Sequence, residues 1–256
     1  MPPTPLLTRL WNERPLALIL ALACAARLLA VFGSPGFAFS DDHFLVIEPA
    51  YYWSQGVPYY LDPADPFTDS FVYAGLHTGL YAAFDALGLS DPLIRLFMIR
   101  LLHAAFSLLT IVLGYRIALR LTGDMPTARQ VGLVLALLWL GPFFSVRTAD
   151  EWVSAPPLLL AVALALRDKR SVWLYLAIGA LFELAFELRY LNAFFPAGLG
   201  AWLLWRRQWG RALWLCVVFA TPLLVFKGAL EWWLLGEPFL ALKEYGSDKF
   251  EIVIPS

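Results

Sequence analysis

The segment from Pro15 to Phe32 reads PLALILALACAARLLAVF, an apolar run interrupted only by Arg27. A helix of this length is long enough to cross the hydrocarbon core of a bilayer. The rest of the chain has the same character, because 60% of its residues are hydrophobic and only 15% are charged. A soluble domain of 256 residues carries more charge and less apolar surface. The sequence therefore predicts an all-α integral membrane protein.

Apolar runs recur along the whole chain, which we interpret as a single transmembrane domain over residues 1–256. The third and fourth runs are short and read as a hairpin that reaches the outer surface. The fifth and sixth are separated at Arg189, and Pro196 predicts a kink in the sixth. About seven membrane-spanning helices are expected, at Pro15–Phe32, Leu93–Leu113, Val131–Phe144, Val153–Leu166, Val172–Leu188, Tyr190–Trp205 and Ala212–Leu230.

The distribution of basic residues predicts the orientation of these helices. With the N-terminus in the cytoplasm, eleven of the nineteen Lys and Arg residues fall in four short inner segments. The long segment 33–91 contains neither Lys nor Arg, so the positive-inside rule places it outside. Arg27 and a poor cleavage site favour a retained first helix over a signal peptide. Arg outnumbers Lys, which together with abundant Ala, Leu and Pro suggests a bacterial protein of the inner (plasma) membrane.

The outer loop 33–91 begins with the motif Phe39-Ser40-Asp41-Asp42-His43-Phe44, and Glu48 follows. Acidic side chains are costly beside hydrocarbon, so two of them next to a membrane-spanning helix indicate a functional site. Asp41 and Glu48 are seven positions apart and fall on nearly the same face of a helix. Paired carboxylates at a membrane surface can accept a proton from a hydroxyl nucleophile. The motif therefore favours transfer chemistry at the outer face.

The same loop contains patterns typical of helices that lie at the membrane interface. Phe44, Ile47 and Tyr51 repeat at helical spacing after a capping Ser or Asp. Pro49 predicts a kink in this helix, and Gly56 predicts its end. A second amphipathic segment, 74–89, is too short to span a bilayer comfortably, so we expect it to lie in the interface. Residues 231–256 form an outer C-terminal segment after the last predicted span.

These motifs resemble the membrane glycosyltransferases of the C superfamily. The likeness is greatest to the mannosyltransferases of GPI-anchor and N-glycan assembly, which carry His-Pro-Asp-Glu after the first transmembrane helix. In this chain Phe39-Ser40 stands where they have His-Pro, and the second acid is Asp42 instead of Glu. The run Arg147-Thr148-Ala149-Asp150-Glu151, the tripeptide Leu188-Arg189-Tyr190 and the segment Glu231–Tyr245 are further likenesses.

The resemblance implies an inverting transfer of a sugar, mannose or another hexose, from a polyprenyl-phosphate carrier to an acceptor hydroxyl. It implies Asp41 as the catalytic base, with Asp42 the alternative. Arg147 and Arg189 are expected to hold the donor phosphate, because arginine matches phosphate geometry. His43 is expected to orient that phosphate, and Glu48 either to bind the acceptor or to stabilise the loop. Family members continue with further spans, so the chain is interpreted as a minimal member, a fragment, or one part of an enzyme whose fold a partner chain completes.

Each candidate residue has a simpler structural explanation. Helix capping would account for one acid of the pair, and Arg147 and Arg189 could be side chains that snorkel from helix ends. His77 and His103 lie on apolar faces and are read as core residues with satisfied hydrogen bonds. Two other functions stay open. The chain could be a non-catalytic subunit, which should tolerate loss of the Asp pair, or a transporter of lipids or sugar-lipids.

Several kinds of chemistry find no support in the sequence. There is no glycine-rich phosphate loop, no zinc-like cluster of Cys and His, and no calcium loop among the acids of the outer loop. We therefore expect no metal site and no cofactor, with the lipid-linked sugar as a substrate and membrane lipid as the surroundings. The net charge of −1 does not indicate nucleic acid. Cys24 and Cys216 lie in apolar runs and are interpreted as small buried hydrophobic residues.

Overall fold

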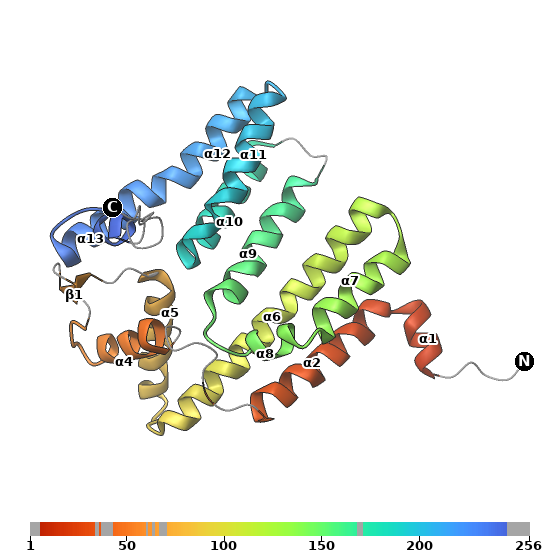
Figure 1. Cartoon of the computed structure of the whole chain (residues 1–256), viewed down its shortest axis with the longest axis horizontal. Coiled ribbons are helices and arrows are strands. Elements are labelled where there is room, and N and C mark those ends of the chain that lie inside the picture. Colours follow the sequence, from red (N-terminus) through yellow and green to blue (C-terminus); the bar gives the residue numbers. More distant parts are fainter. Residues whose placement is uncertain are drawn as a thin grey trace, which may run out of the picture. The chain divides into compact units, whose positions relative to one another are not determined.

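The computed structural model describes residues 6–33, 36, 43–59, 61–62, 65–66, 71–167 and 171–244. In these ranges the chain is helical apart from one small hairpin (Figure 1). The hairpin pairs β1 (Leu61–Asp62) with β2 (Asp65–Pro66) in antiparallel register, Leu61 opposite Pro66. The predicted all-α class is confirmed.

The chain divides into two compact units, which are described separately. Unit 1 comprises Met1–Asp42 and Gly88–Asp168, and unit 2 comprises His43–Leu87 and Lys169–Ser256. Each unit is therefore built from two separate stretches of the sequence, and part of the predicted outer loop belongs to unit 2.

Unit 1 is a bundle in which α2, α6 and α7 pack against one another and α9 packs on α6. Asp91 caps the start of α6, its carboxylate accepting the Leu93 and Ile94 N–H groups at 2.8 and 3.4 Å. Gly123, at φ 67°, closes the other end of α6 in the left-handed conformation that glycine tolerates. The helices of unit 1 are α1 (Leu6–Glu13), α2 (Pro15–Gly33), α6 (Pro92–Thr122), α7 (Met125–Leu137), α8 (Leu140–Phe144) and α9 (Asp150–Ala165).

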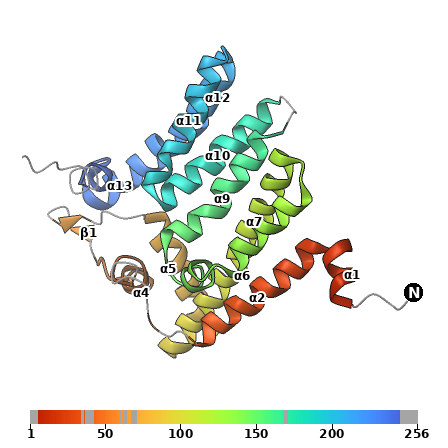
Figure 2. The ribbon, with the colours of Figure 1, turned by 45° about the vertical axis from the view of Figure 1, so that its right-hand side comes forward.

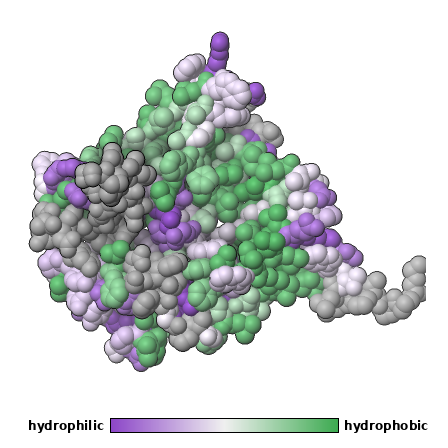
Figure 3. All heavy atoms as spheres, viewed as in Figure 1, coloured by the Kyte–Doolittle hydropathy of each residue, from purple (hydrophilic) through white to green (hydrophobic). Residues whose placement is uncertain are grey.

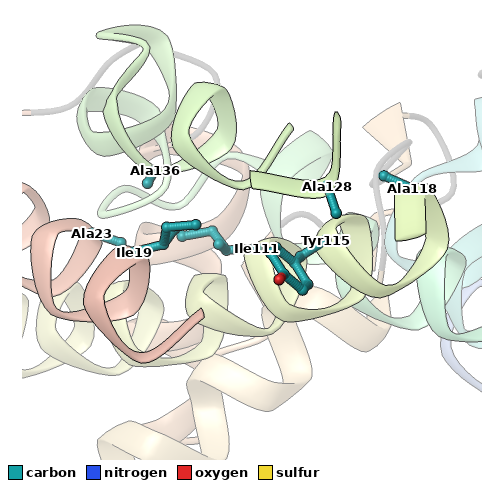
Figure 4. Packing of buried hydrophobic residues seen from close by; sticks show 7 residues of the cluster. All are labelled: Ile19, Ala23, Ile111, Tyr115, Ala118, Ala128 and Ala136. Carbon is teal, nitrogen blue, oxygen red and sulfur yellow. The ribbon is translucent and has the colours of Figure 1, made fainter. Parts of the chain in front are cut away.

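The core of unit 1 is made largely of small residues (Figure 4). Its buried members are Ile19, Ala23, Ile111, Tyr115, Ala118, Ala128 and Ala136. Four of the seven are alanines, so the backbones of α2, α6 and α7 approach closely, as is common in membrane helices. A Cβ added at Gly132 would lie 3.1 Å from Ile19 Cδ1 and 3.2 Å from Tyr115 Cδ2. Close packing of small residues therefore holds this bundle together.

Unit 2 combines the helices of the outer loop with the C-terminal third of the chain. In both Figures 1 and 2, α10, α11 and α12 lie side by side. A Cβ at Gly179 would be 2.9 Å from Val218 Cβ, so this glycine permits the close contact between α10 and α12. The helices of unit 2 are η1 (His43–Ile47), α4 (Glu48–Ser54), α5 (Phe71–Ala86), α10 (Val172–Leu188), η2 (Tyr190–Ala193), α11 (Phe194–Trp205), α12 (Trp209–Thr221), η3 (Pro222–Lys227) and α13 (Gly228–Leu235).

Three helices of the described chain are long and apolar enough to cross a membrane. They are Pro15–Gly33, Pro92–Thr122 and the continuous helix Trp209–Leu235, which contains α12, η3 and α13. Hydrophobic residues cover much of the visible face of both units (Figure 3), as expected for a protein surrounded by lipid. Helices also occupy the other predicted spans, but the number seven stays a prediction. The structure is thus compatible with an integral membrane protein.

Two cysteines differ from the sequence-based interpretation. Cys24 on α2 and Cys216 on α12 are free and exposed on the surface of their helices. The interpretation of both as buried residues is therefore wrong. Apolar surroundings in the sequence do not distinguish a side chain that faces the protein core from one that faces lipid, because both environments favour the same residues.

The helices of the outer loop have slightly different limits from those predicted. The first ends before Gly56, at φ 74°, as expected. The second, α5, covers residues 71–86 where 74–89 was predicted. It ends early because Gly88, at φ 71°, adopts a left-handed conformation that terminates the helix. Pro49 lies in the first turn of α4, where proline is well tolerated, and a π-helical turn precedes it.

Candidate functional site

Glu48 brings together polar side chains of the outer loop. Its carboxylate lies 4.0 Å from His43 Nε2 and accepts a hydrogen bond of 3.2 Å from the Tyr59 hydroxyl. The His43 and Glu48 side chains are each about a third exposed, at 29% and 31%. Two of the predicted substrate-binding residues are therefore neighbours with access to solvent, and Tyr59 joins them without having been predicted. Asp41 and Asp42, the predicted catalytic pair, lie outside the described residues.

An unusual turn connects the acidic motif to Glu48. Residues His43–Ile47 form a π-helical turn, η1, before α4 begins at Glu48. Pro49 explains it, since a residue without an N–H cannot complete the usual hydrogen bond to the carbonyl four residues earlier. Single π-helical turns are rare in proteins, and those that occur are often at functional sites. The local sequence thus produces an irregular helix start immediately after Asp42.

Two arginines of unit 1 lie close together near the chain segment that precedes the acidic motif. Arg147 follows α8, is only 4% exposed and stacks over the Phe143 ring at 3.8 Å while donating to the Phe143 carbonyl. Burial and the positive charge of Arg100 lower the pKa of Arg147 below its ordinary value. Arg100 donates a hydrogen bond to the carbonyl of Gly36. Adjacent like charges favour the binding of an anion between them.

Arg189 is the other predicted phosphate-binding residue, and it belongs to unit 2. It stands at the C-terminal end of α10 in an extended conformation, half-buried, and its carbonyl accepts the Asn192 N–H at 3.0 Å. Arg189 and Arg147 belong to different units. Whether both contact one phosphate stays a prediction.

A buried cluster of charges in unit 2 was not predicted. Lys227, at the end of η3, is 3% exposed, and its Nζ lies 3.1 Å from Glu231 and 3.7 Å from Glu187. The same ammonium donates a hydrogen bond of 2.6 Å to the Tyr190 hydroxyl. Glu231 is completely buried and Glu187 is 5% exposed. One cation and two carboxylates are therefore enclosed by protein at the junction of three helical elements.

A simple signal could have identified this cluster. Lys227 and Glu187 interrupt runs that are otherwise apolar, and an ionisable residue in such a run is expected to be functional and to have a partner. The sequence could not show which partner, because Glu187 is forty positions from Lys227. Only Glu231 stands at the i,i+4 spacing at which helical side chains meet.

Arg27, the one charge of the first apolar run, has a structural explanation. Its Nε donates to Ser107 Oγ at 2.7 Å, and it is 2% exposed. Its remaining N–H groups reach the carbonyls of Ala136 and Leu135 at 3.3 and 3.5 Å. These carbonyls lie in the last turn of α7, where no further helical N–H is available. Arg27 therefore caps α7 instead of facing a substrate.

The two histidines of the apolar faces are buried, as expected of core residues, and one ring nitrogen of each lies at hydrogen-bond distance from a backbone oxygen. The Nδ1 atoms of His77 and His103 lie 2.9 and 2.8 Å from the backbone oxygens of Tyr73 and Ile99. Within the described ranges no group of three or more His, Cys, Asp or Glu side chains could hold a metal ion.

Known proteins add nothing to this description. The chain matches no family model, and no curated protein or solved structure is similar enough to count as a match. The function must therefore be inferred from its own residues.

Proposed function

We propose that this protein is a membrane glycosyltransferase similar to those of the C superfamily. In this proposal it transfers a sugar, mannose or another hexose, from a polyprenyl-phosphate donor to an acceptor hydroxyl at the outer face of a bacterial inner membrane. Seven spans, a cytoplasmic N-terminus and an outer acidic loop belong to the same proposal. The observation that carries it is the pair of neighbouring arginines, one of which is bonded to the segment leading into Asp41-Asp42.

The proposed reaction requires a base and a group that stabilises the leaving phosphate. Asp41, or alternatively Asp42, accepts the proton of the acceptor hydroxyl as its oxygen attacks the anomeric carbon. The bond from that carbon to the phosphate oxygen breaks with inversion, and polyprenyl phosphate leaves with the electron pair. Arg147 and Arg100 supply positive charge where the negative charge develops. The hydrogen bond from Arg100 to Gly36, five residues before Asp41, supports this assignment of roles.

The neighbourhood of Glu48 supports a role in acceptor binding. A carboxylate that contacts a histidine and a tyrosine and stays partly exposed has lone pairs left for sugar hydroxyls. His43, which adjoins Asp42 in the sequence, is proposed to orient the donor phosphate. Arg189, in this proposal, makes a second contact with the donor phosphate.

The test is sugar transfer in membranes that contain the full chain. Labelled polyprenyl-phosphate-mannose is the donor, and wild type is compared with Asp41→Asn and Asp42→Asn. Asp85→Asn is the matched control, since Asp85 belongs to the same acidic loop but contacts Gln55 on the surface. We expect one motif variant to abolish transfer and the control to retain it. Transfer that persists in both motif variants would contradict the mechanism and favour a non-catalytic subunit or a transporter.

A further inference from the structure

The buried Lys227 connects four elements of unit 2. Through Tyr190 and Glu187 it contacts η2 and the end of α10, and through Glu231 it contacts α13. Its ammonium also lies 6.0 Å from the centre of the Phe71 ring on α5. An ammonium removed from water is stable only where carboxylates and hydrogen-bond acceptors surround it. These contacts therefore hold only while the elements keep their positions.

Glu231 extends this network to the C-terminal segment, which we define as residues 236–244. Its second carboxylate oxygen accepts the backbone N–H of Ala241 at 3.0 Å, in fully buried surroundings. Gly236, at φ 77°, turns the chain after α13 so that this segment folds back. Phe239 then packs on Gly228, where an added Cβ would lie 2.7 Å from the ring. The segment is thus fixed by one buried carboxylate and one close contact.

The C-terminal segment in turn packs on the helices of the outer loop. Leu240 and Ala241 share a buried cluster with Leu235 of α13 and with Phe71 and Ala74 of α5. Leu45 of η1 and Trp53 of α4 pack against the same cluster. The η1–α4 helices carry His43 and Glu48. A continuous path of buried contacts therefore runs from Lys227 to the residues that follow the acidic motif.

We propose that Lys227 is a positioning residue that locks the outer-loop helices η1, α4 and α5 onto the C-terminal helices through its buried pairing with Glu187 and Glu231. All the contacts that form this lock, meaning the attachment of the outer-loop helices through Lys227, lie within unit 2. The consequence of the lock for catalysis, the orientation of His43 and Glu48, rests on the proposed function. Loss of the ammonium leaves two buried carboxylates without their counter-ion. Because unpaired buried charges are costly, the helical elements are expected to separate so that water can hydrate the carboxylates.

The lock is tested by the accessibility of a buried thiol, which requires no knowledge of substrate. In full-length protein lacking its native thiols (Cys24→Ser and Cys216→Ser), Ala74→Cys places a thiol in the buried cluster of α5. Val146→Cys is the matched control, since Val146 is equally buried but belongs to a cluster of unit 1. We expect Lys227→Met to increase the maleimide labelling rate at position 74 by about tenfold or more and to leave that at position 146 unchanged.

A second variant separates charge pairing from simple loss of packing. In the triple variant Glu187→Gln, Lys227→Met and Glu231→Gln none of the three buried positions carries a charge, so we expect labelling at position 74 to return most of the way to the wild-type rate. Equal labelling of wild type and Lys227→Met would overturn the lock. Increased labelling at both positions would also overturn it, because that result indicates general unfolding. No recovery in the triple variant would overturn it as well, because the cause would then be lost packing and not lost charge pairing. Sugar transfer enters none of these measurements, so a failed lock and a failed function are distinguishable.

Discussion

Two buried cations, Arg27 of unit 1 and Lys227 of unit 2, are accommodated in opposite ways. Arg27 of unit 1 is surrounded by neutral acceptors, a serine hydroxyl and backbone carbonyls at the end of α7. Lys227 of unit 2 is surrounded by two carboxylates and a phenol. A guanidinium spreads its charge over five donors and matches several weak acceptors, whereas an ammonium concentrates its charge and requires counter-ions. The comparison shows that the buried charge of Arg27 caps a helix, whereas that of Lys227 lies at a junction of elements.

The largest effect is expected at Lys227. Lys227→Met removes the cation of a buried ion pair and leaves its carboxylates in place, which should lower the free energy of unfolding by about 3–5 kcal/mol. Unfolding in mixed micelles of increasing denaturing detergent measures this change. A double-mutant cycle with Glu187→Gln should show coupling between the two positions, and purely additive effects would mean that the ammonium does not need that carboxylate.

A smaller effect is expected at Arg27, because its partners are neutral. Arg27→Leu removes hydrogen bonds from a charged donor and should cost about 1.5–3 kcal/mol in the same unfolding measurement. Arg27→Lys keeps the charge but loses the planar arrangement of donors, so it should recover only part of this stability. If Arg27→Leu lowered the free energy of unfolding more than Lys227→Met does, the proposed difference between the two buried cations would be wrong.

Packing beside Lys227 can be tested without any change of charge. Gly228→Ala places a Cβ 2.7 Å from the Phe239 ring and should cost about 1 kcal/mol, as overpacking does. Gly79→Ala on α5 is the matched control, since nothing lies within 4 Å of its Cβ position. There the better helix propensity of alanine should leave stability unchanged or increase it. Thermal unfolding of both variants measures the difference.

The smallest effect is expected at Asp124, a partly exposed helix cap. Asp124 caps α7, and its hydrogen bonds from the side chain and backbone N–H of Thr127 lower the pKa of the carboxyl below its ordinary value. The folded pKa is therefore below the unfolded one, and the cap stabilises the fold above the unfolded pKa. This contribution is lost as the pH falls through the folded pKa.

Asp124→Ala should accordingly lower the melting temperature slightly at neutral pH, and the difference from wild type should shrink in acid. Melting curves of the two proteins from neutral pH down to below pH 3 measure this trend. A difference that grows as the pH falls would contradict the assigned direction of the pKa.

Local patterns in the sequence predict much of the fold. Gly56 ends a helix where expected, and the apolar runs coincide with helices because membrane helices are recognisable by composition alone. The side of a helix that faces the core is harder to predict. Cys24 and Cys216 proved exposed, since lipid and protein interior select the same residues. Pro49 predicted a disturbance, but not that it would take the form of a π-helical turn.

The candidate site is less accessible to sequence reasoning because its residues are distant in the chain. His43 and Glu48 are five positions apart, and side chains at that spacing do not share a face of an α-helix. They approach to 4.0 Å across the π-helical turn, which the sequence did not predict. The Lys227–Glu187 pair joins two helices whose packing no local pattern encodes. The same holds for Arg100 and Arg147, which meet only because α6 and the turn after α8 lie together in unit 1.

The most direct test of the proposed function is donor turnover by the purified chain in lipid vesicles. Polyprenyl-phosphate-mannose and a hydroxyl acceptor are supplied, and the release of polyprenyl phosphate is measured for wild type and for the double variant Asp41→Asn, Asp42→Asn. The account predicts release by wild type, none above background by the double variant, and unchanged folding of both by their melting curves. Equal release by the two proteins would contradict it.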